Sequence, residues 1–210
     1  MYLLKKINLD DAWQKEQGWN EERKSGRKFD DRKELEFWEK LAPHYSEQFN
    51  LYRDVPGLKE KIFSLVGENS SVLDLGCGSG ILSIAALLLG ADRAVACDID
   101  EKCMDVAYEN AALNGVGRDR YTVRWGDVVT DQALRQELGG PYDVVVANIV
   151  ADVIKALAST VRPLVKEGGI FLCSGIIDDR AEEVAQCLRD NGWTIAEARS
   201  SEGWFSYLCR

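Results

Sequence analysis

From Ser71 onward, short apolar runs alternate with segments whose apolar residues recur at helical spacing. Short apolar runs are typical of buried strands, and their alternation with helices is typical of a mostly parallel sheet covered on both faces. The pattern therefore predicts strands near 71–76, 94–98, 121–125, 143–148, 169–174, 193–198 and 203–209, with helices over 81–89, 101–113, 130–138, 151–165 and 179–191.

The last two predicted strands are separated only by the turn from Arg199 to Gly203. A parallel crossover needs about a dozen residues or more, so these two strands should pair antiparallel. We therefore expect a Rossmann-like α/β fold with a seven-stranded, mostly parallel sheet, one antiparallel strand and helices on both faces.

The chain before this sheet has a different character. Residues 1–66 are charged and rich in aromatic residues at helical spacing, with breaks at Pro43 and at the segment 54–57. We expect an N-terminal helical cap or lid over residues 1–55 and a main domain over residues 56–210.

Composition excludes several classes of protein. The formal net charge of −9 argues against broad electrostatic capture of nucleic acid, which relies on basic surface. No apolar stretch is long enough for a signal peptide or a membrane span. The six cysteines form no C-x-x-C pair, so neither zinc nor a disulfide framework is expected. We expect a cytoplasmic protein without a bound metal, and nothing in the composition indicates an oligomeric state.

A glycine-rich turn follows the first predicted strand. The strand that contains Asp74 leads into a loop with glycines at 76, 78 and 80. Because glycine has no side chain, the backbone of this loop can approach a ligand closely. Asp98 follows twenty residues after Gly78, at the end of the second strand, where a carboxylate can hold both hydroxyls of a ribose. The pair predicts a nucleoside site.

The glycine spacing favours one nucleoside cofactor over another. The loop has a glycine at every second position, whereas the dinucleotide fingerprint is G-x-G-x-x-G. A carboxylate at Asp74 would repel a pyrophosphate but can orient the ammonium of a methionine moiety. We therefore predict S-adenosylmethionine as the cofactor, held by Asp74 and by the loop residues Gly76, Cys77, Gly78 and Gly80, and hence a methyltransferase domain.

The adenine ring should lie near the end of the third strand. Asp127 can accept a hydrogen bond from the exocyclic amine, and apolar neighbours such as Ile99 and Val128 can enclose the ring. The alternative for Asp127 is a solvent-facing turn residue. Asp100 is expected to cap the following helix.

Asn148 is the predicted catalytic residue. At the end of the fourth strand, its side-chain carbonyl can accept a hydrogen bond from an acceptor amine and aim the amine lone pair at the methyl group. A structural asparagine in a strand-end turn is the alternative. His44, the only histidine, could deprotonate an acceptor, and Tyr45, Tyr52 and Trp204 could form walls of the acceptor pocket, although packing roles are the alternative for all four.

Several stretches together resemble one family. They are Asp74 to Leu82, Asp98-Ile-Asp, Glu109-Asn-Ala, Ala147-Asn-Ile and Ser174-Gly-Ile, spread over residues 71–177. They resemble the bacterial PrmA methyltransferases, which methylate amino groups of a ribosomal stalk protein. The resemblance implies cofactor contacts for Gly76 and Asp98, and a position facing both cofactor and acceptor for Asn148.

The N-terminal part departs from that family. Residues 55–59 lack the family's threonine-containing glycine-rich segment, and the larger substrate-recognition domain has no room here. Residues 37–45 instead look like the first helix of small-molecule methyltransferases. Transfer to an amine nitrogen of a protein is therefore the main hypothesis, transfer to a small molecule is the first alternative, and a non-catalytic regulatory protein that binds S-adenosylmethionine is the second.

Overall fold

The computed structural model describes residues 65–201 and 203–210. The expected cap over residues 1–55, its boundary, and the candidate residues His44, Tyr45 and Tyr52 lie outside the described residues. The fold below is that of the predicted main domain.

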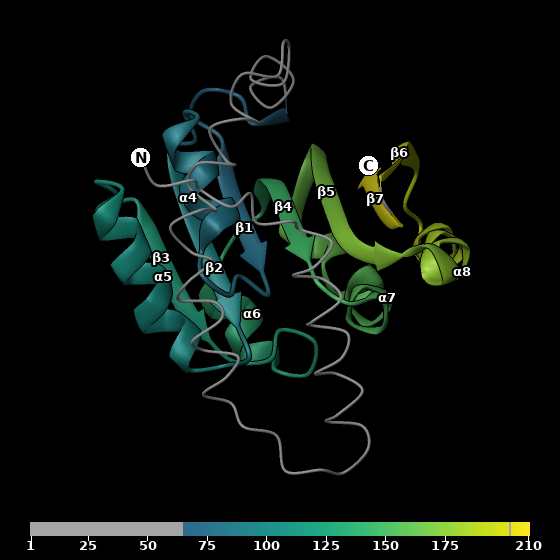
Figure 1. Ribbon diagram of the computed structural model, residues 1–210, viewed down its shortest axis with the longest axis horizontal. Helices are drawn as coiled ribbons and strands as arrows, with labels where there is room; N and C mark the ends of the chain where they lie inside the picture. The colour runs from purple at the N-terminus through teal and green to yellow at the C-terminus, as the bar shows by residue number, and fades with distance from the viewer. Residues whose placement is uncertain (1–64, 202) are drawn as a thin grey trace, which may run out of the picture. The chain divides into compact units, whose positions relative to one another are not determined.

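A seven-stranded sheet forms the centre of this domain (Figure 1). Its strand order is β3-β2-β1-β4-β5-β7-β6. The pairs among β1 to β5 are parallel, while β7 runs antiparallel to both of its neighbours, β5 and β6. The predicted sheet with one reversed strand is confirmed. The strands are β1 (Ser71–Leu75), β2 (Arg93–Asp98), β3 (Tyr121–Trp125), β4 (Tyr142–Asn148), β5 (Val165–Ile177), β6 (Ile195–Ser201) and β7 (Trp204–Cys209).

Helices cover both faces of the sheet, as predicted. One apolar core joins the sheet to α4 (Ile81–Leu88) and α5 (Lys102–Leu113), and includes Ile84 and Ala107. The other core lies on the opposite face and includes Leu134 and Ile154. Its helices are α6 (Gln132–Leu138), α7 (Ala151–Thr160) and α8 (Asp178–Asp190).

The junction between α7 and β5 differs from the prediction. The helix was expected to continue to residue 165, but it ends at Thr160 and a short 3-10 turn, η1 (Arg162–Leu164), follows. Pro163 has no backbone N–H to continue the helical ladder, which explains the early end. Strand β5 then begins at Val165, four residues before the expected start, where it pairs with Tyr142.

Candidate functional site

A cleft lies at the carboxyl ends of β1, β2, β3 and β4. It has a volume of about 590 Å³. Ligands in open α/β sheets bind at this edge, because the loops that follow the strands converge there. The cleft brings together five residues that the sequence predicted to contact a cofactor: Gly76, Asp98, Ile99, Asp127 and Val128.

The glycine-rich turn is joined to Asp98 by a hydrogen bond. The backbone N–H of Gly78 donates to Oδ2 of Asp98 at 2.8 Å, and the N–H of Asp100 donates to Oδ1 at 2.9 Å. Each carboxylate oxygen can accept a further hydrogen bond, since each has two lone pairs. The half-buried carboxylate of Asp98 is therefore held at the rim of the cleft with capacity for two more donors.

Gly76 permits a close approach between the turn and the end of β4. Its φ is +71°, and a Cβ at this position would lie 2.4 Å from Cγ2 of Ile149. A side chain here would collide with another lining residue of the cleft, so the turn requires glycine.

Asp74 lies beneath the glycine turn and does not line the cleft. Only 1% of the residue is exposed, and its Oδ2 accepts from the N–H and the hydroxyl of Ser83 on α4, at 3.1 and 2.7 Å. Among the described residues, its Oδ1 has no hydrogen-bond partner. Burial raises the pKa of Asp74 to about 6, although the bonds from Ser83 oppose the shift. Its predicted action on a methionine ammonium stays a prediction.

Cys77 and Gly80, like Gly78, are not among the lining residues of the cleft. Cys77 is 5% exposed and belongs to the core beneath α4, where burial raises the pKa of its thiol. Gly80 faces Tyr121, whose hydroxyl would lie 2.7 Å from a Cβ at this position. Both residues shape the turn from inside the protein.

Asp127 stabilises the turn after β3 and also lines the cleft. Its carboxylate accepts from the hydroxyl of Thr130 at 2.7 Å and from the N–H of Val129 at 2.9 Å, and these bonds lower the pKa of Asp127. Nearby, Ile99 is 71% exposed, and its carbonyl accepts from Nε1 of Trp125 at 3.0 Å. Asp100 accepts from the N–H of Lys102 at 3.0 Å, which is the expected role at the start of α5.

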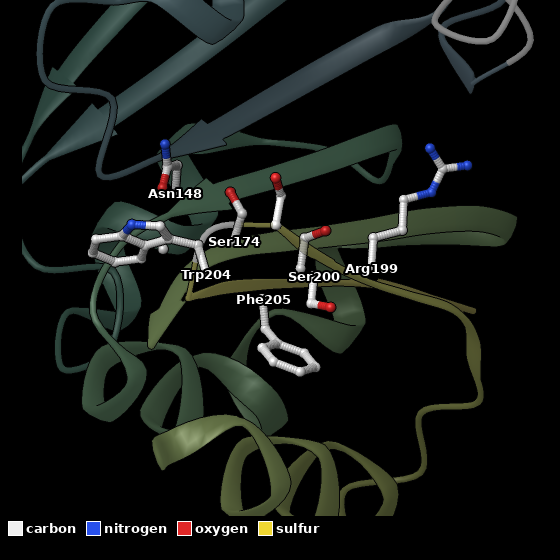
Figure 2. A pocket seen from close by; sticks show the side chains of 9 residues that line it. Asn148, Ser174, Arg199, Ser200, Trp204 and Phe205 are labelled. Atoms are coloured by element: carbon white, nitrogen blue, oxygen red, sulfur yellow. The ribbon is translucent and has the colours of Figure 1, made fainter. Parts of the chain in front are cut away.

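A second cavity of about 630 Å³ lies over the ends of β4 and β5 and over β6 and β7 (Figure 2). Asn148 and Trp204 both line this cavity, and their predicted roles toward an acceptor stay predictions. In Figure 2 these two side chains lie toward one end and Arg199 toward the other, while the ring of Phe205 points to the opposite side of the strand. The lining residues are Asn148, Ser174, Gly175, Arg199, Ser200, Ser201, Trp204, Phe205 and Ser206.

Consecutive residues at the end of β4 line the two cavities. Asn148 lines the second cavity, and the next residue, Ile149, lines the cleft. Asn148 was predicted to face both cofactor and acceptor; its exposed side chain lines the second cavity and is not among the lining residues of the cleft.

Gly175 positions Asn148, and the sequence interpretation did not single it out. With φ at +83°, it lies beside a register shift in β5, and a Cβ would lie 2.7 Å from Oδ1 of Asn148. Ser174, Ser206 and Arg199 were also missed as lining residues. The Ser174-Gly175-Ile176 stretch contributed to the family resemblance, and this was the signal that could have placed Ser174 and Gly175 at the site.

Within 65–201 and 203–210 there is no group of three or more His, Cys, Asp or Glu side chains that could hold a metal ion. The six cysteines are free thiols. In the same part of the chain, no helix is long and apolar enough to cross a membrane.

The reversed strand β7, the glycine-rich turn after β1 and the acidic residue that ends β2 together define a class I methyltransferase domain. The TehB-like S-adenosylmethionine-dependent methyltransferase of Corynebacterium glutamicum shares this fold, with a TM-score of 0.60, 14% identity, and coverage of 83% of this chain and 98% of that chain. The chain belongs to the PrmA family, because the family model described as ribosomal protein L11 methyltransferase matches residues 60–210.

Individual relatives agree with this family. The ribosomal protein L11 methyltransferase of Agathobacter rectalis is 36% identical over 184 residues, covering 80% of this chain and 57% of the relative. That of Desulforamulus reducens is 41% identical over 150 residues, covering 71% and 46%. The ribosomal protein L11 methylase structure from Lactobacillus delbrueckii has a TM-score of 0.64 at 31% identity, covering 71% of this chain and 73% of that chain. The chain spans about half the length of the curated relatives it matches.

Proposed function

We propose that this protein is an S-adenosylmethionine-dependent methyltransferase that transfers a methyl group to an amine nitrogen of a protein. Membership of the PrmA family supports the reaction, and the activity of the relatives as ribosomal protein L11 methyltransferases supports a protein acceptor. Because the chain spans about half of those relatives, the acceptor itself is part of the proposal.

The cleft fits S-adenosylmethionine. Asp98 has two acceptor positions for ribose hydroxyls, and the exposed side chain of Ile99 faces the same cleft as Val128, where an adenine ring could be enclosed. Two solved proteins of the same fold are described as complexes with S-adenosylhomocysteine, an RNA methyltransferase of Salinibacter ruber among them. When bound, the cofactor supplies a methyl group already activated on a sulfonium.

The protein's own contribution is alignment. Asp98 holds the ribose, Asp127 accepts from the adenine amine, and the ionised form of Asp74 favours the methionine ammonium through its negative charge beneath the turn. Asn148 orients the acceptor nitrogen through a hydrogen bond to its side-chain carbonyl. Holding two reactants in the productive geometry accelerates their reaction without strong acid or base catalysis.

The observation that carries the proposal is that consecutive residues at the end of β4, Asn148 and Ile149, line the two cavities. On this basis we infer that a methyl donor in the cleft and an acceptor in the second cavity would approach each other beside Asn148.

A transfer assay that resolves products by mass tests the proposal. Purified protein is incubated with a fractionated bacterial lysate and methyl-labelled S-adenosylmethionine, and the Asn148→Ala variant serves as the control. We expect label in the protein fraction with the unmodified chain and much less with the variant. Label confined to the low-mass fraction would indicate a small-molecule methyltransferase. Cofactor binding without formation of S-adenosylhomocysteine would indicate a regulatory protein.

A further inference from the structure

A row of polar side chains crosses the second cavity from Asn148 to the edge of the sheet. The strand registers pair Asn148 with Ser174, Ser174 with Ser206, and Ser206 with Arg199. Residues directly paired across neighbouring strands project from the same face of a sheet. We call these four residues the polar row; each of them lines the cavity, and Figure 2 shows the labelled members Asn148, Ser174 and Arg199 on one side of the sheet.

The polar row ends in a positive charge. Among the described residues that line the cavity, Arg199 is the one with a charged side chain, and none is acidic. The guanidinium forms an ion pair with Glu197, whose Oε2 accepts from Nη2 at 2.8 Å and from Nε at 3.2 Å. Its Nη1 has no partner among the described residues, and 63% of the side chain is exposed. Arg199 therefore has donors left for an anion.

The polar row also sets the distance between Asn148 and Arg199. Neighbouring strands lie about 4.8 Å apart, so three strand spacings separate Asn148 from Arg199 by about 14 Å. An extended peptide advances about 3.3 Å per residue, and about four residues cover this length. The serines between the two ends can donate to peptide carbonyls along the way.

We propose that Arg199 is a specificity-determining residue that binds an acidic side chain of the acceptor, about four residues from the amine that is methylated. The inference rests on the proposed function, because it names the kind of protein segment that the site accepts. An arginine suits this role, since its planar guanidinium binds carboxylates through two parallel hydrogen bonds.

Peptides with a free N-terminal amine test the proposal directly. In a set of heptapeptides of glycine and serine, a single aspartate stands at each position from two to seven in turn, and one further peptide has none. Dissociation constants are measured with S-adenosylhomocysteine present. We expect the unmodified chain to bind the peptides with aspartate at position four or five at least fivefold more tightly than the peptide without aspartate.

Three variants separate recognition from a structural role. Arg199→Gln should remove the positional preference and leave the affinity for S-adenosylhomocysteine unchanged. Glu197→Gln should strengthen the preference, because it releases Nε and Nη2 of Arg199. Arg189→Gln is the matched control, since Arg189 is half exposed on α8 and pairs with Glu182. It should behave as the unmodified chain does.

The outcomes distinguish this inference from the proposed function. Equal binding of all peptides, absence of peptide binding, or a preference that persists in Arg199→Gln would overturn the role of Arg199. The proposed function is decided separately by whether label enters the protein fraction of a lysate. Labelled protein together with equal binding of all peptides would support the proposed function and refute the role of Arg199.

Discussion

Two carboxylates on either side of the glycine turn differ in exposure and therefore in what they can contact. Asp98 lies at the rim of the cleft, while Asp74 is almost fully buried against Ser83. A residue at the rim should affect cofactor binding directly, whereas a buried charge should also affect the stability of the fold.

Replacing Asp98 by alanine should weaken binding of S-adenosylhomocysteine at least tenfold. A hydrogen bond to a charged group contributes about 1.5–3 kcal/mol, and loss of one such bond corresponds to about a factor of ten. Titration calorimetry measures the affinity, with Asp100→Ala as the control because that carboxylate contacts the start of α5. Equal affinities for the unmodified chain and Asp98→Ala would refute the ribose contact.

Replacing Gly175 by alanine should lower the rate of methyl transfer more than it lowers cofactor affinity. The new Cβ would lie 2.7 Å from Oδ1 of Asn148, so the carboxamide must move. Gly168→Ala is a matched control, since Gly168 also has a positive φ, +75°, but a Cβ there would meet nothing within 4 Å. If both variants lose turnover equally, backbone strain and not displacement of Asn148 is responsible.

Asp74 should make stability depend on pH in a definite direction. Burial raises its pKa from 3.8 to about 6, so between these values the folded state holds a proton that the unfolded state releases. The contribution of Asp74 to stability is therefore fully present below about pH 4 and is lost as the pH rises through 6. A shift of this size corresponds to roughly 3 kcal/mol.

Urea denaturation of the unmodified chain and of Asp74→Asn, from pH 4 to pH 7, measures this effect. The asparagine carbonyl can still accept both bonds from Ser83 but carries no charge. As the pH rises, the free energy of unfolding of Asp74→Asn should increase relative to that of the unmodified chain. A difference that stays constant over this range would show that Asp74 has an ordinary pKa.

At the scale of elements, helix α6 depends on a single capping side chain. Asp131 precedes the helix with extended backbone, and its carboxylate accepts from the N–H of Leu134 at 3.0 Å. Asp131→Ala should reduce the free energy of unfolding by about 1 kcal/mol, while Asp131→Asn should keep most of the stability because its carbonyl can accept the same bond. Urea denaturation distinguishes the two, and equal losses would mean that charge and not the cap is responsible.

Most elements could be predicted because their apolar periodicity coincides with clear stop signals. α4 and α5 end as expected, before Gly90 and Gly115, both with positive φ. The α7 to β5 junction could not be predicted from periodicity, because Val161, Leu164 and Val165 continue the helical spacing even though Pro163 interrupts the backbone bonds.

Candidate site residues could be predicted where a single segment of the sequence contains the motif. They could not be predicted where pairing between several strands brings them together. Gly76 and Asp98 follow directly from the loop and its spacing. Arg199 and Ser206 join Ser174 only through strand pairing, and the sequence does not show which residues of β6 and β7 lie opposite each other. A register shift of one residue would turn Arg199 to the other face, so its place in the cavity needed the structure.

At the scale of the whole molecule, we expect the main domain to fold and to bind its cofactor without the preceding residues. The described parts of the sheet, of both cores and of the lining of both cavities come from residues 65–201 and 203–210. We expect residues 56–210 alone to unfold cooperatively and to bind S-adenosylhomocysteine. Calorimetry and thermal denaturation of this shortened chain provide the measurement. A chain that aggregates or does not bind would show that residues before 56 contribute to the fold or to the cleft.

Because β7 runs antiparallel to β5, it begins at the edge of the sheet where β5 ends, and its last residue lies toward the opposite edge. Trp204 stands beside Asn148, whereas Arg210 lies with Ser70 and Gly168 at the edge where β1 begins. Tethering the protein to a sensor surface through Arg210 therefore leaves the edge that contains Asn148 and Trp204 facing the solution. Candidate acceptors of any size can then be presented to this edge without obstruction from the support.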